Sequence, residues 1–126
     1  MVLVDTSVWV DHFRRRDEVL AALLEAGEVT CHPFIVGELA CGNIQNRPEI
    51  LSLLSALPSL GKAEDDEVLL FIDRHDLMGR GLGLIDVHLL ASCTLAGVPV
   101  WTRDTKLARA ATELKLNAVE WGVEAD

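Results

Sequence analysis

Four acidic residues are the part of this sequence most suited to chemistry. Asp5 directly follows the apolar run VLV, and Asp104 follows the apolar run VPVW after two intervening residues. Glu38 and Asp86 each interrupt an otherwise apolar stretch, FIVGELA and LIDVHLLA. A buried carboxylate without a partner is costly and tends to take up a proton. A divalent cation removes that cost, and Mg²⁺ or Mn²⁺ prefers carboxylate oxygens together with retained water. The four acids therefore predict a metal site, provided that the fold brings them together.

Each acid also has a structural alternative. Asp5 and Asp104 could each cap a following helix, because a short acidic side chain accepts hydrogen bonds from a helix's first amides. Asp86 could sit near a helix start, where the helix dipole favours negative charge. Glu38 could lie on the polar edge of its helix. Only their convergence in space distinguishes a metal site from four separate local roles.

The elements that must position these acids alternate between short strands and helices. Such alternation predicts an α/β fold, a three-layer α/β/α sandwich with a mainly parallel central sheet. Because ligands bind beyond the carboxyl ends of parallel strands, Asp5 and Asp104 are expected at the same sheet edge. We predict strands at Val2–Val4, Val29–Cys31, Val98–Trp101 and Ala118–Trp121, and helices starting at Thr6 or Ser7 and covering 17–26, 33–42, 48–57, 64–77, 84–96 and 106–114.

Length and composition favour one compact domain over residues 1–126. Half of the 126 residues are hydrophobic, which suits a single sizeable core. We expect no membrane segment, since a carboxylate is reached at the fifth residue, and the odd count of three cysteines suits a reducing cytoplasm. We expect those cysteines to be small buried hydrophobes. The net charge of −9 argues against a protein that simply coats nucleic acid, because such proteins carry a basic face.

Four segments carry a family resemblance. VLVDTSVWVDHF, HPFIVGELACG, GLIDVHLLAS and VWTRDTKLARAA resemble the PIN-domain family, and their order is most similar to that of the VapC toxins of bacterial toxin–antitoxin pairs. The resemblance spans nearly the whole chain. It implies an α/β/α fold, Mg²⁺- or Mn²⁺-dependent cleavage of RNA, homodimerisation, and inhibition by a cognate antitoxin.

The resemblance assigns roles to individual residues. Asp5, Glu38, Asp86 and Asp104 match the family's four acids, with Asp5 and Asp104 expected as direct metal ligands. Asp86 would bind directly or through water, and Glu38 would hold a metal-bound water or orient the attacking one. Further candidate substrate-binding residues are Thr6 or Ser7, Thr102, Arg80, Arg103 and the run Arg14, Arg15 and Arg16, for which a solvated helix end is the main alternative. One departure is that Thr105 and Lys106 stand where some members carry a further acid.

Two other function classes compete with a nuclease. A phospho-receiver-like signalling domain should have an acidic pair after its first strand and a lysine ending a late strand, whereas Lys106 enters a helix. A catalytically inactive partner-binding module would not need all four acids. The three tryptophans, Trp9, Trp101 and Trp121, are expected in the core rather than as base-stacking platforms. The histidines His32 and His88 are expected to pack or to cap helices.

Overall fold

The computed structural model describes residues 1–123 and contains a parallel three-stranded sheet with seven α-helices. The strands are β1 (Val2–Val4), β2 (Val29–Thr30) and β3 (Val100–Trp101), in the order β2-β1-β3. Val2 pairs with Val29, and Val4 pairs with Trp101. The predicted α/β class and parallel sheet are confirmed, and the predicted domain end at residue 126 lies outside the described residues.

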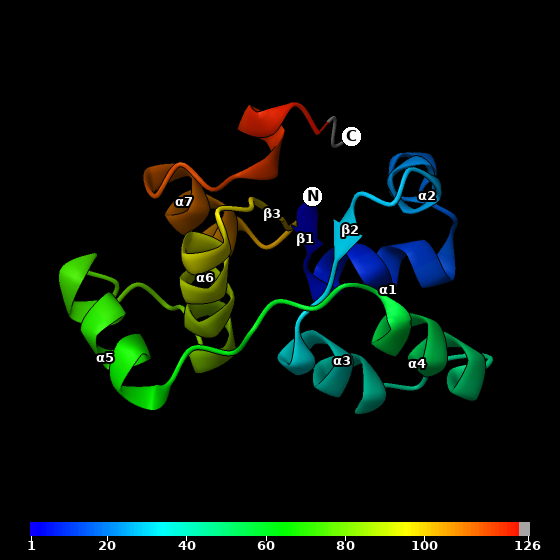
Figure 1. The fold of residues 1–126 in the computed structure, drawn as a ribbon, viewed down its shortest axis with the longest axis horizontal. Helices are drawn as coiled ribbons and strands as arrows, with labels where there is room; N and C mark the ends of the chain where they lie inside the picture. Colours follow the sequence, from blue (N-terminus) through cyan, green and yellow to red (C-terminus); the bar gives the residue numbers. More distant parts are fainter. Residues whose placement is uncertain (124–126) are drawn as a thin grey trace.

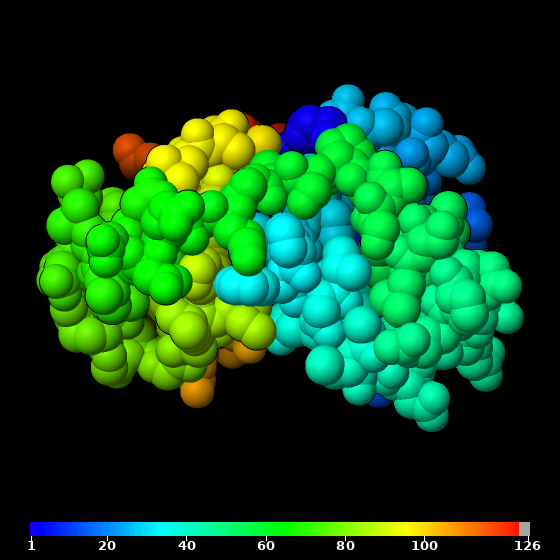
Figure 2. Space-filling model, turned by 60° about the horizontal axis from the view of Figure 1, so that its bottom comes forward, coloured from blue at the N-terminus to red at the C-terminus, as the bar shows by residue number. Residues whose placement is uncertain are grey.

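The helices follow the predicted positions closely. They are α1 (Thr6–Arg14), α2 (Glu18–Glu25), α3 (Pro33–Ala40), α4 (Arg47–Ala56), α5 (Asp65–Arg74), α6 (Leu84–Ala96) and α7 (Thr105–Glu113). In Figure 1 the sheet lies between a group formed by α6 and α7 and a group formed by α1 and α2. The segment after α4 crosses the molecule to reach α5, so that α3 and α4 form one lobe and α5 with α6 the other (Figures 1 and 2).

The last predicted strand is wrong. Residues Ala118–Trp121 form a 3₁₀ helix, in which the Asn117 side chain accepts a hydrogen bond from the Val119 amide (3.1 Å). Gly122 ends this helix at φ 102°, a conformation that favours glycine. The sheet gains only a single bridge there, between Val100 and Asn117. Trp121 is 54% exposed and so does not lie in the core as expected.

The core is formed by apolar side chains from all three strands and from helices on both sides. The central strand β1 is fully buried, as are Leu89 and Leu90 of α6, the most enclosed helix. Cys31 and Cys93 are buried as predicted, whereas Cys41 is exposed at the end of α3, which corrects that expectation. Among residues 1–123, no helix is both long and apolar enough to cross a membrane.

Candidate functional site

The carboxyl edge of the sheet positions Asp5 at the centre of the candidate site. Asp5 follows the central strand, its amide donates to the Trp101 carbonyl (2.9 Å), and its side chain is only 6% exposed. The same side chain caps α1, because Oδ2 accepts weakly from the Ser7 amide (3.4 Å) and strongly from the Ser7 hydroxyl (2.8 Å). Thr102 donates a third hydrogen bond to Oδ2 (2.8 Å). Asp5 is thus held by elements nearly a hundred residues apart.

Thr102 connects Asp5 to Asp104 at this edge. The Thr102 hydroxyl donates to Asp5 and accepts from the Asp104 amide (3.0 Å), so the two acids share one threonine. Asp104 caps α7, since its Oδ1 accepts from the Leu107 amide (2.9 Å). Parallel pairing of β1 with β3 therefore brings the acids that follow these strands to one edge, as the sequence predicted.

Glu38 and Asp86 reach the site from α3 and α6. The Thr6 hydroxyl donates to Glu38 Oε1 (2.9 Å), which ties the first residue of α1 to the middle of α3. Asp86 lies in the first turn of α6, and its Oδ2 accepts from the Gly83 amide (3.1 Å). Both Thr6 and Ser7, which the sequence left as alternatives, therefore bind a carboxylate, each a different one.

In each of the four carboxylates, one oxygen accepts hydrogen bonds from residues 1–123 and the other does not. Asp5 Oδ2, Glu38 Oε1, Asp86 Oδ2 and Asp104 Oδ1 accept the hydrogen bonds described above. The other oxygen of each accepts no hydrogen bond from the described part of the chain. The local capping roles and a metal role are therefore compatible, because they use different oxygens.

The four carboxylates also influence one another electrostatically. Burial raises the pKa of Glu38 and, although the Thr6 hydrogen bond opposes this, the charges of Asp5 and Asp86 raise it further. Burial likewise raises the pKa of Asp86, against the Gly83 hydrogen bond, and the charges of Asp5 and Asp104 add to that effect. Each pair of neighbours therefore repels, and an added cation would relieve the repulsion.

The donor set fits a hard divalent cation, with one restriction. Carboxylate oxygens without hydrogen-bond partners are the ligands that Mg²⁺ and Mn²⁺ prefer. Within residues 1–123, however, no three His, Cys, Asp or Glu side chains are close enough to hold one ion together. Water molecules between the ion and some of the acids would satisfy this spacing, since Mg²⁺ usually keeps several of its waters.

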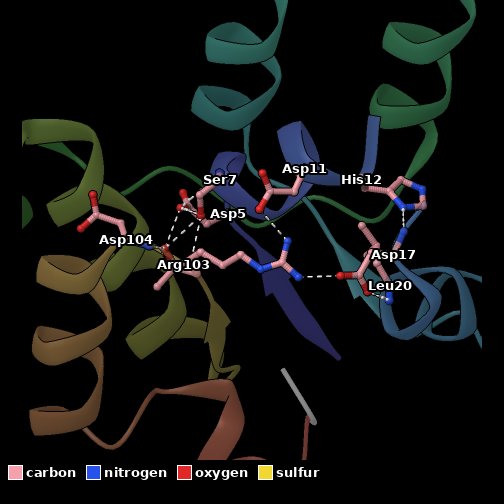
Figure 3. Close-up of polar contacts among 9 residues, drawn as sticks. Asp5, Ser7, Asp11, His12, Asp17, Leu20, Arg103 and Asp104 are labelled. Carbon is pink, nitrogen blue, oxygen red and sulfur yellow. Dashed lines mark hydrogen bonds and ion pairs between the residues drawn. The ribbon is translucent and has the colours of Figure 1, made fainter. Parts of the chain in front are cut away.

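Arg103, a predicted RNA contact, has its charge engaged elsewhere. Its guanidinium pairs with Asp11 (2.9 Å) and Asp17 (2.5 Å) and lies over the Trp101 ring, 5.5 Å from its centroid. Figure 3 shows the side chain extended from the site toward Asp17, away from Asp104. Burial alone would raise the pKa of Asp17, but the Leu20 amide and Arg103 together lower it. The arrangement ties the segment after β3 to α1 and to the start of α2.

The other predicted basic residues lie on two sides of the acids. Arg14 is the last residue of α1, Arg15 and Arg16 follow it, and all three are exposed, as the solvated-helix-end alternative expects. Arg14 also lines a cavity of about 670 Å³ beside Thr6 and Glu38. Arg80 lies in the loop before α6 and pairs with Glu113 of α7 (2.5 Å). Whether any of them contacts RNA stays a prediction.

His32 is buried and caps α3, so the sequence prediction that it packs or caps a helix is confirmed. The His32 side chain is 0% exposed, and its Nδ1 accepts from the Phe34 amide (3.0 Å), so it caps α3. Its Nε2 lies 3.1 Å from the Ser92 hydroxyl, which donates in turn to the Gly61 carbonyl (2.8 Å). This chain joins the helix of Glu38 to the helix of Asp86. The only local signal was a histidine placed just before the proline that opens α3.

Known proteins resemble this chain in sequence and in fold. The family model described as the PIN domain matches residues 2–113. Ribonuclease VapC32 of Mycobacterium tuberculosis is 46% identical over 114 residues, which cover 90% of this chain and 92% of that protein. Among solved structures, a toxin–antitoxin complex from Klebsiella pneumoniae superposes with a TM-score of 0.64 and 20% identity, covering 84% of this chain and 88% of that one. VapBC-1 from nontypeable Haemophilus influenzae superposes with a TM-score of 0.64 and 15% identity, covering 90% of this chain and 94% of that one.

Proposed function

This chain belongs to the PIN domain family, and on that premise we propose that it is a metal-dependent endoribonuclease and the toxin of a toxin–antitoxin pair. The observation that carries the proposal is that Thr102 joins Asp5 to Asp104 at the sheet edge, with Glu38 and Asp86 near enough for the neighbouring acids to raise their pKa values. Support also comes from the 46% identity to a protein named a ribonuclease. A phospho-receiver domain is not supported, because Lys106 lies in α7 and not at the end of a strand.

The four acids would hold Mg²⁺ or Mn²⁺, directly or through water. When bound, such an ion lowers the pKa of a coordinated water and offsets the negative charge of the reacting phosphate. Asp5 and Asp104 are the proposed direct ligands, because Thr102 fixes their relative position. Asp86 is held by the Gly83 amide and would complete the shell.

Glu38 is the proposed proton acceptor. The Thr6 hydroxyl fixes its Oε1 and leaves Oε2 available to take the proton of the attacking water. The water oxygen then bonds to phosphorus while the bond to the leaving ribose oxygen breaks, and that oxygen takes up a proton from solvent water. A carboxylate with a raised pKa is better matched to this task than an ordinary one, because its proton affinity lies nearer to neutral pH.

RNA, a cognate antitoxin and a second copy of the chain are the proposed partners. Structural neighbours that are toxin–antitoxin complexes support the antitoxin. Several leucines on α4, α5 and α6 are more than half exposed, and this apolar surface suits protein contacts. Light scattering of the purified chain, alone and with its antitoxin, measures both assemblies. The cytoplasm is the proposed location, which suits three cysteines that form no disulfide in residues 1–123.

The decisive experiment compares two charge-neutralising variants in an RNA cleavage assay with Mg²⁺. Asp5→Asn should reduce cleavage by at least about a hundredfold, a loss in the range of losing one essential catalytic interaction. Asp66→Asn, which neutralises an exposed acid on α5, is the matched control and should cleave normally. EDTA should stop the wild-type reaction. Full activity of Asp5→Asn would refute the proposed metal ligand, and no cleavage by wild type with either metal would favour an inactive partner-binding module.

A further inference from the structure

A second hollow has three basic side chains and, within the described part of the chain, no acidic one in its lining. This hollow of about 380 Å³ is lined by Arg80, Thr105, Lys106 and Arg109, and it lies between the loop before α6 and the first turns of α7. The Lys106 side chain rests on Gly81 of that loop: a Cβ built on Gly81 would lie 2.9 Å from Lys106 Nζ. The loop and the helix are thus in contact, and three cations face one space without an acid among its lining residues.

The cations of this hollow are largely free to bind an anion. Lys106 and Arg109 form no ion pair with any residue from 1 to 123. Arg80 uses one guanidinium nitrogen for Glu113, which leaves its remaining N–H donors for another acceptor. In a chain with a net charge of −9, this concentration of positive charge needs an explanation.

The arginine-rich hollow at the end of α1 is different. Its lining mixes basic with acidic side chains: Asp11, Arg14, Arg15, Arg16, Asp17, Glu18 and Arg103. Arg16 pairs with Glu18 (3.0 Å), and Arg103 pairs with two aspartates. Its positive charge is therefore mostly compensated, so a phosphate is attracted more strongly to the hollow formed by Arg80, Lys106 and Arg109.

The position of the basic hollow relative to the acids gives it a role. Lys106 lies two residues after Asp104, and the Gly81 loop leads directly to Gly83, whose amide holds Asp86. We infer that Arg80, Lys106 and Arg109 bind a backbone phosphate of the RNA adjacent to the cleaved bond. This inference rests on the proposed function. It adds the position of the substrate phosphate that neighbours the cleaved bond. It also gives a reason for Lys106 at a place where some family members carry an acid.

The test measures RNA binding as a function of salt. A fluorescent single-stranded RNA is titrated with the Lys106→Gln/Arg109→Gln pair and with the Arg74→Gln/Lys115→Gln pair, which changes the net charge equally but lies elsewhere. All proteins carry Asp5→Asn to prevent cleavage. Because each neutralised phosphate on a single strand contributes about 0.7 to the salt slope, the first pair, which removes the contact to one phosphate, should lower the slope by about 0.7 and the affinity about fivefold near 0.1 M salt. The control pair should bind nearly as tightly as the parent.

A second pair of variants moves Lys106 without changing charge. Gly81→Ala places a methyl group against the Lys106 side chain, whereas Gly79→Ala meets nothing within 4 Å. Both glycines have the same kind of backbone, with φ of +75° and +69°, so the conformational strain of alanine is matched. Gly81→Ala should weaken RNA binding relative to Gly79→Ala, but by less than the charge pair does, because only the flexible end of the Lys106 side chain has to move. Equal binding by the two, together with equal binding by the two charge pairs, would overturn the inference.

Inorganic pyrophosphate separates this inference from the proposed function. In NMR titrations of the wild-type chain, pyrophosphate should shift the amide signals of Gly81, Lys106 and Arg109, and the Lys106→Gln/Arg109→Gln pair should lose these shifts. If wild type neither binds nor cleaves RNA but pyrophosphate still shifts these signals, the anion site stands and the nuclease proposal fails. If RNA is cleaved while pyrophosphate leaves these signals unchanged and the variants bind RNA normally, the nuclease stands and the phosphate site is refuted.

Discussion

The buried His32 gives the sharpest quantitative prediction, because its hydrogen bonds determine its protonation state. Nδ1 accepts from the Phe34 amide, and the single Ser92 hydroxyl hydrogen goes to the Gly61 carbonyl. Nε2 must therefore carry the ring hydrogen and donate to Ser92 Oγ. A second proton would have to go on Nδ1, where it would oppose the Phe34 amide hydrogen. The native structure thus requires neutral His32.

Burial is the main cause of the lowered pKa of His32 and so determines how strongly stability depends on pH. Together with the nearby charges of His88 and Lys62, it lowers the pKa of His32 from 6.5 to about 4. Between these values the unfolded chain binds a proton that the folded chain does not, so stability rises with pH across this window. The contribution is complete above the unfolded value and is lost as the pH falls toward 4. The full shift corresponds to about 3 kcal/mol, of which about 2 kcal/mol is lost between roughly pH 7 and pH 5.

The assay is urea unfolding, followed by the fluorescence of the buried Trp9 and Trp101. Between about pH 7 and pH 5, the free energy of unfolding of wild type should fall by about 2 kcal/mol more than that of His32→Gln. His12, whose pKa burial also lowers, titrates in both proteins and cancels in this difference. His75→Gln is the matched control, because His75 takes no part in the hydrogen bonds that join Phe34, His32, Ser92 and Gly61. Its stability should depend on pH as that of wild type does. Identical pH dependence of His32→Gln and wild type would refute the reasoning.

Three further predictions concern the acids and their surroundings. Glu38→Gln and Asp86→Asn keep their hydrogen-bond acceptors but lose a negative charge that burial makes unfavourable. Each should therefore raise the melting temperature in EDTA and abolish cleavage. A lower melting temperature would assign these residues purely structural roles. Mg²⁺ at about ten times its Kd should stabilise wild type by about 1.4 kcal/mol but stabilise Asp5→Asn much less, as calorimetry would measure; equal stabilisation would place the ion elsewhere. Arg103→Gln should lower the free energy of unfolding in urea by about 1–2 kcal/mol, because it loses the ion pairs with Asp11 and Asp17. The salt slope of RNA binding should stay unchanged. A slope lower by about 0.7 would make Arg103 a phosphate contact.

Local patterns were enough to predict most of the fold. Leu84–Ala96 was predicted with its observed bounds, because a long apolar run between Gly83 and Gly97 leaves little choice, and Gly97 ends the helix at φ 69°. Ala118–Trp121 failed because its apolar residues suit a strand or a helix equally well. There the outcome is set by Asn117, which caps the turn, and by the lack of a full partner strand.

The acids of the site were predictable, but their supports were not. Asp5 and Asp104 follow strands, and parallel pairing places such residues at one edge whatever the rest of the chain does. The His32–Ser92 contact joins residues sixty positions apart, and the Lys106–Gly81 contact joins residues of a loop and a later helix. Such pairs are determined by packing, and a single sequence carries no periodic signal for them.

The two interpretations that the sequence offered for each acid turn out not to exclude one another. Asp5 and Asp104 each cap a helix start with one carboxylate oxygen, and Asp86 uses one oxygen to hold the amide of Gly83, the N-cap of α6. Glu38 uses one oxygen to hold Thr6 at the start of α1. Because a helix start is fixed by its cap, the same hydrogen bonds that stabilise the fold also fix the orientation of each carboxylate. An amide replacement should preserve the cap and remove the charge, which separates the two roles experimentally. The site therefore needs no additional scaffold, since the helix starts that the sheet brings together already orient its acidic groups.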